Sequence, residues 1–488
     1  MKHIIRRIIP IVLLLGGTLT GCNNPANNET HYVRLSDAAC TFRHTDNTPF
    51  TIEVITSPDN WEARSSGSWL QAERQGTALV LTPEENLTGA ERSTEVTVTA
   101  GQATARIQVT QLGDTTLPII YRKLDDLHSS AISPDGNIVG GYYSTADDES
   151  YSKMTVVFID LRTGERTEFG PYPESLILPT SVSCVTSQGL MYVVNGQGDM
   201  FAFDMHERNY FIPEVAGYAT IQVNSSSAYG TKWVGRATGK GETMYVPLIS
   251  ENGTVRELPM TELNYRNEPH SMGIIARGIS ADGSIIYGTS WENSDFGMLY
   301  WINNGTSTAA PKWVGHDVKE VWEETMKMSD GTEYTTHLVN GLICQAQLTK
   351  ISPNGKWIAS SYRTETPADD RTSIITTQTA AFYNTETETT TIVSDYGESV
   401  GVHVTDDGIG FIGIGTLGIS SGAVYDLNTG TDLGSTQDWV YDNYGIIIPA
   451  GYINYVSADG RFVLGTKAES SAGGVSFINW YIAPPVAK

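Results

Sequence analysis

Aromatic and acidic residues occur together in several segments of the chain that carry turn signals. Sugars expose apolar C–H faces that stack on aromatic rings, and their hydroxyl groups need carboxylate or amide partners. This mixture is therefore compatible with a glycan-binding surface, although each tryptophan could instead fill a core. The candidate ligand-binding residues are Trp291, Glu292, Asp295, Trp322, Tyr396, Trp439 and Tyr441.

Motifs for catalysis are weak by comparison. Gly418–Gly422 matches GxSxG, but that motif needs a strand–turn–helix context, and no helical pattern follows it here. The nine histidines form no HExxH pair. The acidic clusters Asp147–Glu149 and Asp369–Asp370 could bind a hard cation or act as acid and base, yet acidic loop tips are usually only solvated. We expect no enzyme, no catalytic residue, no metal and no cofactor.

One hairpin pattern recurs along the chain and must position these candidates. AISPDGNIVGGYY (131–143), GISADGSIIYGTS (278–290), TKISPNGKWIASSY (349–362) and YVSADGRFVLGT (455–466) each place a tight turn between two apolar strands. Proline presets φ at the second turn position, and glycine accepts a positive φ at the fourth. A third strand follows each hairpin, and often a fourth.

The spacing of these turns predicts a β-propeller. The turn glycines are Gly136, Gly189, Gly283, Gly355, Gly408 and Gly460, and a degenerate copy turns near Gly230. Seven units of about four strands each, with a period near 50 residues, indicate seven blades around one axis. The last unit is one strand short, so residues 116–124 are expected to complete it from the other end and close the ring. The predicted fold is all-β.

These repeats resemble TolB-type and WD-type propeller repeats. The resemblance implies that the SxDG turns lie on one face, and that the opposite, loop-bearing face carries function and holds the candidate residues. The interval between the fourth and fifth units is about 20 residues longer than the others. Within it, residues 316–328 show apolar spacing that predicts a helix, with Val318, Val321, Trp322 and Thr325 on one face. The insertion at 313–345 would be a lid or a structural plug.

Residues 31–113 alternate apolar and polar side chains in four runs, which predicts a small immunoglobulin-like β-sandwich. Trp61, Trp69-Leu70, Asn86–Gly89 with Arg92, and Val109–Gly113 resemble the BACON domain of secreted Bacteroidetes proteins. The family name implies carbohydrate binding, although a spacer role next to a membrane is the alternative. Trp61 and Trp69 could be sugar platforms or core residues, and the core is the more usual place for them.

The N-terminus has the organisation of a signal peptide. Basic residues precede the apolar run 8–17, and Leu19–Cys22 resembles a bacterial lipobox. Residues 1–21 would be removed, Cys22 would be lipidated, and residues 22–30 would be a tether. We therefore expect an outer-membrane lipoprotein of the cell envelope, facing either the cell surface or the periplasm. Three widely spaced cysteines then remain, which is not a disulfide framework.

The chain has 488 residues and a formal net charge of −24, so it would repel nucleic acid. The sequence as a whole predicts a lipid-anchored, non-catalytic binding protein. In this hypothesis a BACON-like spacer carries a propeller (114–488) whose loop face recognises a glycan or a glycoprotein. The alternatives are a protein–protein scaffold in an envelope assembly and a propeller hydrolase or lyase acting on polysaccharide.

Overall fold

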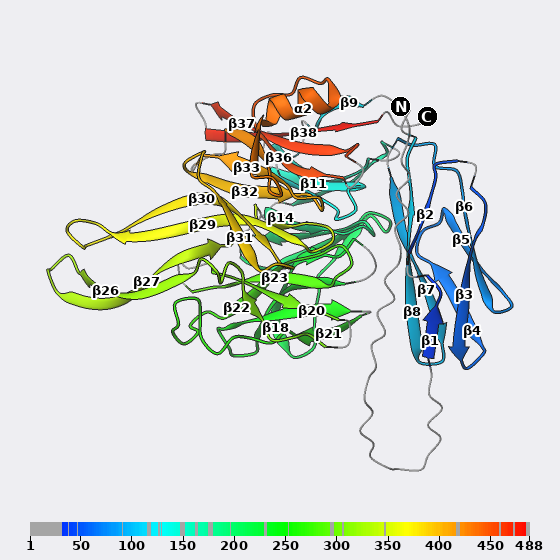
Figure 1. Ribbon diagram of the computed structural model, residues 1–488, viewed down its shortest axis with the longest axis horizontal. Coiled ribbons are helices and arrows are strands. Elements are labelled where there is room, and N and C mark those ends of the chain that lie inside the picture. Colours follow the sequence, from blue (N-terminus) through cyan, green and yellow to red (C-terminus); the bar gives the residue numbers. More distant parts are fainter. Residues whose placement is uncertain are drawn as a thin grey trace, which may run out of the picture.

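The computed structural model contains two parts built almost entirely from strands (Figure 1). It describes residues 32–484 except for short gaps, at 38, 46, 90, 115–118, 125–126, 128, 147–151, 162–163, 174–178, 196, 229–231, 252, 293–296, 305–306, 346–347, 416–419, 458–459 and 472–473. The predicted signal peptide, Cys22 and the tether lie outside the described residues. Within the described part, no helix is long and apolar enough to cross a membrane.

The N-terminal part is a sandwich of two four-stranded sheets, with strand orders β1-β3-β6-β5 and β2-β8-β7-β4. All pairs are antiparallel except β2 with β8, which is parallel. The strands are β1 (Tyr32–Leu35), β2 (Ala39–Phe42), β3 (Phe50–Ser57), β4 (Trp61–Ser65), β5 (Leu70–Gln75), β6 (Ala78–Pro83), β7 (Arg92–Ala100) and β8 (Ala103–Gln111).

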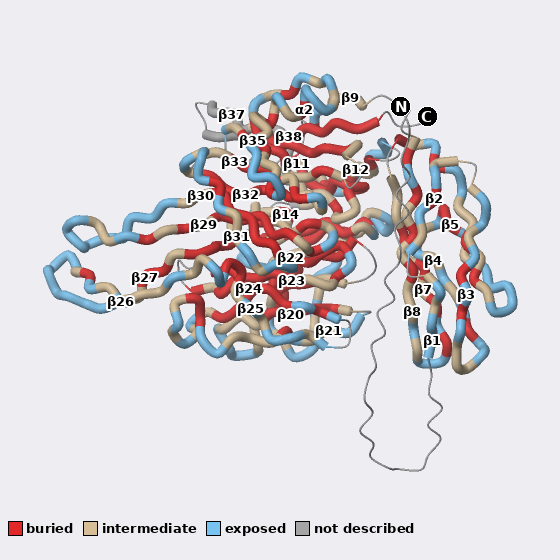
Figure 2. The backbone as a smooth tube through the Cα atoms, in the orientation of Figure 1, coloured by how far each residue is buried: buried red, intermediate tan, exposed pale blue. Residues whose placement is uncertain are grey.

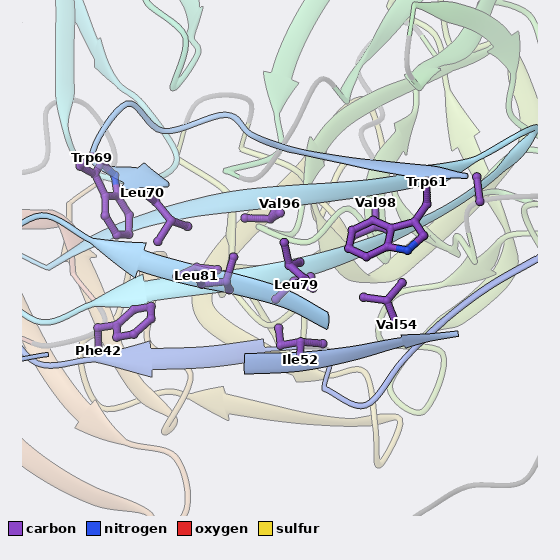
Figure 3. Packing of buried hydrophobic residues seen from close by; sticks show 13 residues of the cluster. Phe42, Ile52, Val54, Trp61, Trp69, Leu70, Leu79, Leu81, Val96 and Val98 are labelled. Atoms are coloured by element: carbon purple, nitrogen blue, oxygen red, sulfur yellow. The ribbon is translucent and has the colours of Figure 1, made fainter. Parts of the chain in front are cut away.

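Both tryptophans of the sandwich fill its core, as Figure 3 shows. Trp61 and Trp69 are 3% and 6% exposed, and they pack among alternating residues of both sheets. Arginines cover the rings from outside: the guanidinium carbon of Arg74 lies 4.8 Å from the Trp61 ring, and that of Arg92 lies 4.5 Å from the Trp69 ring. Neither ring is therefore available as a sugar platform.

The remaining strands form seven antiparallel sheets, which we call the seven-sheet domain (residues 119–484). Six sheets have four strands each, and the fifth has six. In order, the strands are β10–β13 (Ser129–Ile132, Ile138–Ala146, Ser152–Asp160, Arg166–Pro173), β14–β17 (Pro179–Val185, Leu190–Asn195, Met200–Asp204, Asn209–Phe211), β18–β21 (Tyr218–Ser226, Trp233–Gly239, Tyr245–Glu251, Thr254–Glu257), β22–β25 (Ile274–Ile279, Ile285–Ser290, Met298–Ile302, Lys312–Trp313), β26–β31 (Glu320–Lys327, Glu333–Ile343, Lys350–Ile351, Trp357–Pro367, Ile374–Asn384, Thr389–Val393), β32–β35 (Ser399–Val404, Ile409–Ile414, Ser421–Asp426, Thr431–Ser435), and β36–β38 with β9 (Tyr452–Val456, Val463–Ser471, Gly474–Ala483, Ile120–Leu124).

The recurring hairpin turn has one design in these sheets. In the first, the Ser133 hydroxyl accepts a hydrogen bond from the Ile138 N–H at 2.9 Å. Ser280, Ser352 and Ser457 accept the same bond from the residue five positions later. All six predicted turn glycines have a positive φ, between 69° and 86°. The same serine-based turn thus joins two strands in four of the seven sheets.

The strand that precedes the first hairpin completes the last sheet. β9 pairs antiparallel with β38, from Ile120 opposite Ala483 to Leu124 opposite Asn479. The last sheet also packs on the first: Leu464 and Tyr481 share one apolar cluster with residues of β11 and β12. In addition, the Asn479 amide donates to the Ser130 hydroxyl at 2.8 Å. The two ends of the seven-sheet domain are thus held together.

The predicted helix over 316–328 is wrong. Residues Glu320–Lys327 form strand β26, which pairs residue by residue with β27 from Glu320 opposite Asn340 to Lys327 opposite Glu333. The apolar spacing fits a helix, but Val321, Trp322 and Thr325 also favour strands, and long pairing with β27 decides the outcome. Together β26–β27 and β29–β30 form a projecting arm with exposed ends (Figure 2). The insertion is therefore not a helical plug.

A helix occurs instead where the sequence analysis expected only a loop. Helix α2 (Thr436–Tyr444) begins after Ser435, whose side chain accepts from the Asp438 N–H, and ends at Gly445 with φ 66°. Val440 is buried, and Trp439 packs on the apolar cluster between the last two sheets. The helix caps these sheets (Figure 1).

Candidate functional site

The innermost strands of the seven sheets surround a central cavity of about 530 Å³. Every one of the seven sheets, or its first turn, contributes to the lining. Several turn residues, such as Pro134, Ala281 and Pro353, are part of it, so the cavity extends to the SxDG turns. Its volume is in the range of small-molecule sites. This places the strongest candidate site at the centre, and not on the loops that the sequence favoured.

A bulge in the innermost strands places polar side chains in this lining. In β14, β18, β22 and β36 the register slips by one residue, which leaves Ser183, Asn224, Arg277 and Asn454 as the extra residues. Each of these four lies three positions before the first residue of the turn, and each lines the cavity. A bulge re-aims its side chain relative to the regular pleat. The repeat therefore provides one adjustable position in each of these four sheets.

Some of these side chains also tie neighbouring sheets together. The Ser183 hydroxyl donates to the Val223 carbonyl at 2.9 Å, and the Asn224 amide donates to the Ala276 carbonyl at 2.8 Å. The Tyr287 hydroxyl likewise donates to the Thr349 carbonyl of the next sheet at 2.7 Å. Such bonds hold the innermost strands at fixed separations, so the cavity is formed before any ligand enters.

The cavity is positively charged. Arg277 and Lys350 line it, and no aspartate or glutamate is among its described lining residues. In the described part of the chain neither cation makes an ion pair. The Arg277 Nε atom is buried without a hydrogen-bond partner. Burial lowers the pKa of Lys350. In a chain with 55 acidic residues, the described lining of the central cavity therefore has a positive charge.

The histidine of the lining is unsuited to proton transfer. His403 is 4% exposed, and its Nε2 atom accepts a hydrogen bond from the Val456 N–H at 3.1 Å. Burial, followed by the nearby charge of Lys350, lowers the pKa of His403 to about 3. The ring is therefore neutral at physiological pH and already engaged on one nitrogen.

The predicted site residues do not come together. Glu292 is 7% exposed and has a structural role. Its carboxylate accepts hydrogen bonds from the Ser271 and Met272 N–H groups at 2.8 and 3.1 Å, and it contacts His270 at 3.0 Å. Trp291 is partly buried, and the guanidinium carbon of Arg277 lies 5.3 Å from its ring. Trp291 is thus the one predicted residue that contacts a cavity residue, and Asp295 lies outside the described residues.

The other predicted residues are spread over distant elements. Trp322 is partly buried in β26 of the arm, and Tyr396 packs beside the core of the fifth and sixth sheets. Trp439 makes an edge contact with the Phe411 ring at 5.1 Å, which assigns it to the core. Tyr441 on α2 is 57% exposed. None of the predicted residues that the structure describes lines the central cavity.

The remaining chemical candidates find little support in the described residues. Gly418 and Ile419 of the GxSxG match lie outside them, and strand β34, not a helix, begins at Ser421. The cluster at 147–149 also lies outside. Asp370 sits in the exposed turn between β29 and β30, where it accepts from the Thr372 N–H at 3.0 Å. No group of three or more potential metal ligands occurs within the described ranges.

Sequence reasoning missed Arg277 and Lys350. Both stand beside the repeated turn, three and two residues before its first serine. When the seven turns are aligned, the position three residues before each turn can be compared between the repeats. Arg277 is the single charged residue there, in the series Ser130, Ser183, Asn224, Arg277, Thr349, Val402 and Asn454. That comparison would have pointed to the centre.

Several solved structures are similar to the chain. In solved structures the chain is similar to TolB from Acinetobacter baumannii (14% identity, 64% of this chain and 62% of that one, TM-score 0.31). It is also similar to the β-propeller domain of the Trilobed protease from Pyrococcus furiosus (10%, 82% and 97%, 0.34) and to the Cps50 (Swd1) β-propeller domain from Myceliophteria thermophila (8%, 74% and 99%, 0.36). The chain thus spans less than two thirds of the TolB structure.

Among curated proteins, none matches the chain. A family match covers part of the sandwich: residues 59–112 match BACON, described as "Putative binding domain, N-terminal". The match includes both buried tryptophans and the strands from β4 to β8. This chain therefore carries a BACON domain in its N-terminal sandwich.

Proposed function

We propose that the protein is a non-catalytic binding protein of the cell envelope, whose seven-sheet domain is a closed seven-bladed β-propeller that holds a glycan in its central cavity. The observation that carries this proposal is the cavity itself, which polar side chains from several sheets line. Amide groups of Gln222, Asn224 and Asn454 suit sugar hydroxyls, and the Tyr455 ring offers an apolar face.

Titration of the purified full-length protein against a glycan array tests this proposal. Gln222→Ala and Tyr455→Ala should weaken the array signal, because both side chains line the cavity. Trp322→Ala is the matched control, since it removes an aromatic ring from the arm and leaves the cavity intact. Loss of signal in Trp322→Ala alone would instead assign the glycan to the loop-bearing face. If no class of glycan on the array gives a binding signal, glycan binding is contradicted.

In this proposal the BACON domain is a spacer, and Cys22 carries a lipid that holds the protein on the outer membrane. The burial of Trp61 and Trp69 supports the spacer role, because it removes the obvious sugar-stacking rings. A Cys22→Ala variant should leave the membrane fraction. Protease treatment of intact cells then distinguishes a surface from a periplasmic orientation. A variant that still fractionates with membranes would refute the anchor.

A scaffold function is the second candidate, and the arm favours it. Apolar side chains at its ends are exposed, with Met328 at 52% and Ile375 at 53%. The tips of its two hairpins are joined, because Arg371 bonds to Glu324 at 2.6 Å and its carbonyl accepts from the Lys327 N–H. Crosslinking should then recover a stoichiometric envelope protein, and its loss in a Met328→Lys, Ile375→Lys variant would support this function.

Catalysis on polysaccharide is the least supported function. The described lining of the cavity holds no carboxylate, and His403 is neutral and engaged. Incubation with a polysaccharide panel, followed by reducing-end analysis, should yield no product. Released oligosaccharides that disappear in a His403→Gln variant would overturn this expectation.

A further inference from the structure

The charge of the central cavity opposes the charge of the protein. The chain has 31 basic and 55 acidic residues, yet the described lining of the cavity includes Arg277 and Lys350 and no acid. Two acids that lie close in sequence to lining residues are in the turns and accept hydrogen bonds there. Asp282 accepts from Ser280 at 2.7 Å, and Asp406 accepts from the Asn354 N–H at 2.9 Å.

Both cations are held without a counter-ion in the described part of the chain. Removing a cation from bulk water is unfavourable unless hydrogen bonds or an opposite charge compensate. Burial lowers the pKa of Lys350, which reflects this cost. The Nε atom of Arg277 is buried and has no acceptor. An anion in the cavity would supply the missing partner to both groups.

The guanidinium of Arg277 is also oriented. Arg277 is the bulged residue of β22, so its side chain departs from the regular pleat and reaches the cavity. The Trp291 ring lies 5.3 Å from its guanidinium carbon, a cation–π contact that restricts the side chain. A fixed, planar fork of donors matches a carboxylate or a phosphate better than a flexible ammonium does.

We propose that the cavity binds an oxyanion carried by a small polar ligand, with Arg277 as the bidentate partner and Lys350 as the second charge. This inference rests on the proposed function and adds the charge of the ligand. The amide and hydroxyl groups beside the two cations would bind the polar remainder, as in an acidic sugar. A free inorganic oxyanion would offer the same charged oxygen atoms to Arg277 and Lys350, and the experiment must distinguish it from an acidic sugar.

Isothermal titration calorimetry of the full-length protein at low salt provides the test. The ligands are glucuronate, glucose, inorganic phosphate and sulfate. Glucuronate should bind at least tenfold more tightly than glucose, and its affinity should fall when salt is raised, because charges are screened. Tight binding of phosphate or sulfate without preference for glucuronate would support the inference and identify a free oxyanion as the ligand.

Variants assign the effect to the two cations. Arg277→Gln and Lys350→Gln should each weaken glucuronate binding at least tenfold, and Arg277→Lys should weaken it less than Arg277→Gln, because it keeps the charge and loses the fork. Lys123→Gln is the matched control: it removes one positive charge from an exposed position of β9 and should leave the affinity unchanged. Thermal unfolding checks that each variant is folded.

Two results would overturn the inference in different ways. If glucose and glucuronate bind equally and Arg277→Gln does not change their affinity, the ligand is a glycan in the cavity and its binding needs no anionic group. If Trp322→Ala abolishes glycan binding and Arg277→Gln does not, both the anionic ligand and the central location of the site are refuted. Absence of binding by all four ligands together with a blank glycan array would remove the proposed function itself.

Discussion

Acid should destabilise the seven-sheet domain through His403. In the folded protein burial holds the pKa of His403 at about 3, whereas an unfolded histidine titrates near 6.5. Two aromatic rings cover the imidazole, with centroids 5.6 Å (Phe411) and 5.7 Å (Tyr455) away, and the Lys350 ammonium opposes a second positive charge. Protonation of Nε2 would also remove the acceptor of the Val456 N–H.

The sign of the effect follows from proton binding. Between pH 6.5 and 3 the unfolded chain binds a proton at this position and the folded chain does not, so stability is complete above pH 6.5 and falls as the pH falls through this window. Each unit of pH below 6.5 costs about 1.4 kcal/mol of unfolding free energy, so the loss at pH 5 is about 2 kcal/mol.

Chemical unfolding of the wild type and of His403→Gln at pH 7 and pH 5 measures this loss. Glutamine keeps an acceptor for the Val456 N–H and cannot titrate. The wild type should therefore lose about 2 kcal/mol more than the variant between the two pH values, because the other titrating groups are common to both. Equal losses in the two proteins would show that His403 is not the buried neutral group described above.

Three further changes have expected outcomes. Lys350→Met should raise the free energy of unfolding without ligand by about 1 kcal/mol, because it removes an unpaired, buried charge, and a lower melting temperature would contradict this. Glu365→Ala should cost about 3–5 kcal/mol, since Glu365 pairs with Arg266 at 2.8 Å and with the Val339 N–H at the base of the arm, and faster proteolysis of the arm would report it. Trp61→Ala should destabilise the BACON domain by about 3–5 kcal/mol and leave glycan affinity unchanged, which calorimetry and binding together can check.

Turn chemistry made much of the seven-sheet domain readable from the sequence. Serine and glycine stand at fixed positions of a turn because the backbone demands a side-chain acceptor and a positive φ there. These demands are local, so a single sequence displays them. The pairing of β9 with β38 was predicted in the same way, from one strand too few at the C-terminal end and one too many at the start.

The arm and the site were harder to predict because non-local contacts decide them. Val321, Trp322 and Thr325 fit a helical face and a strand equally well, and only the partner β27 selects the strand. Glu292 looked like a ligand carboxylate, yet the loop at 270–272 folds around it and engages both of its carboxylate oxygens. A residue type in a predicted loop does not reveal whether it faces solvent or supports the backbone.

The repeat also explains how the fold can stay stable although the residue type at the bulge position, which lines the cavity, differs between sheets. Ser183 and Asn224 occupy the bulge position and bond to the carbonyl groups of the next sheet, so there the position links neighbouring sheets. Arg277 occupies the equivalent position, but its Nε atom has no hydrogen-bond acceptor among the described residues. The bonds made by its neighbours keep the spacing that Arg277 does not maintain, so this sheet is free to present a charge to a ligand. By the same reasoning, introducing an arginine at Asn224 should cost a bond between sheets, whereas changing Arg277 should cost mainly binding.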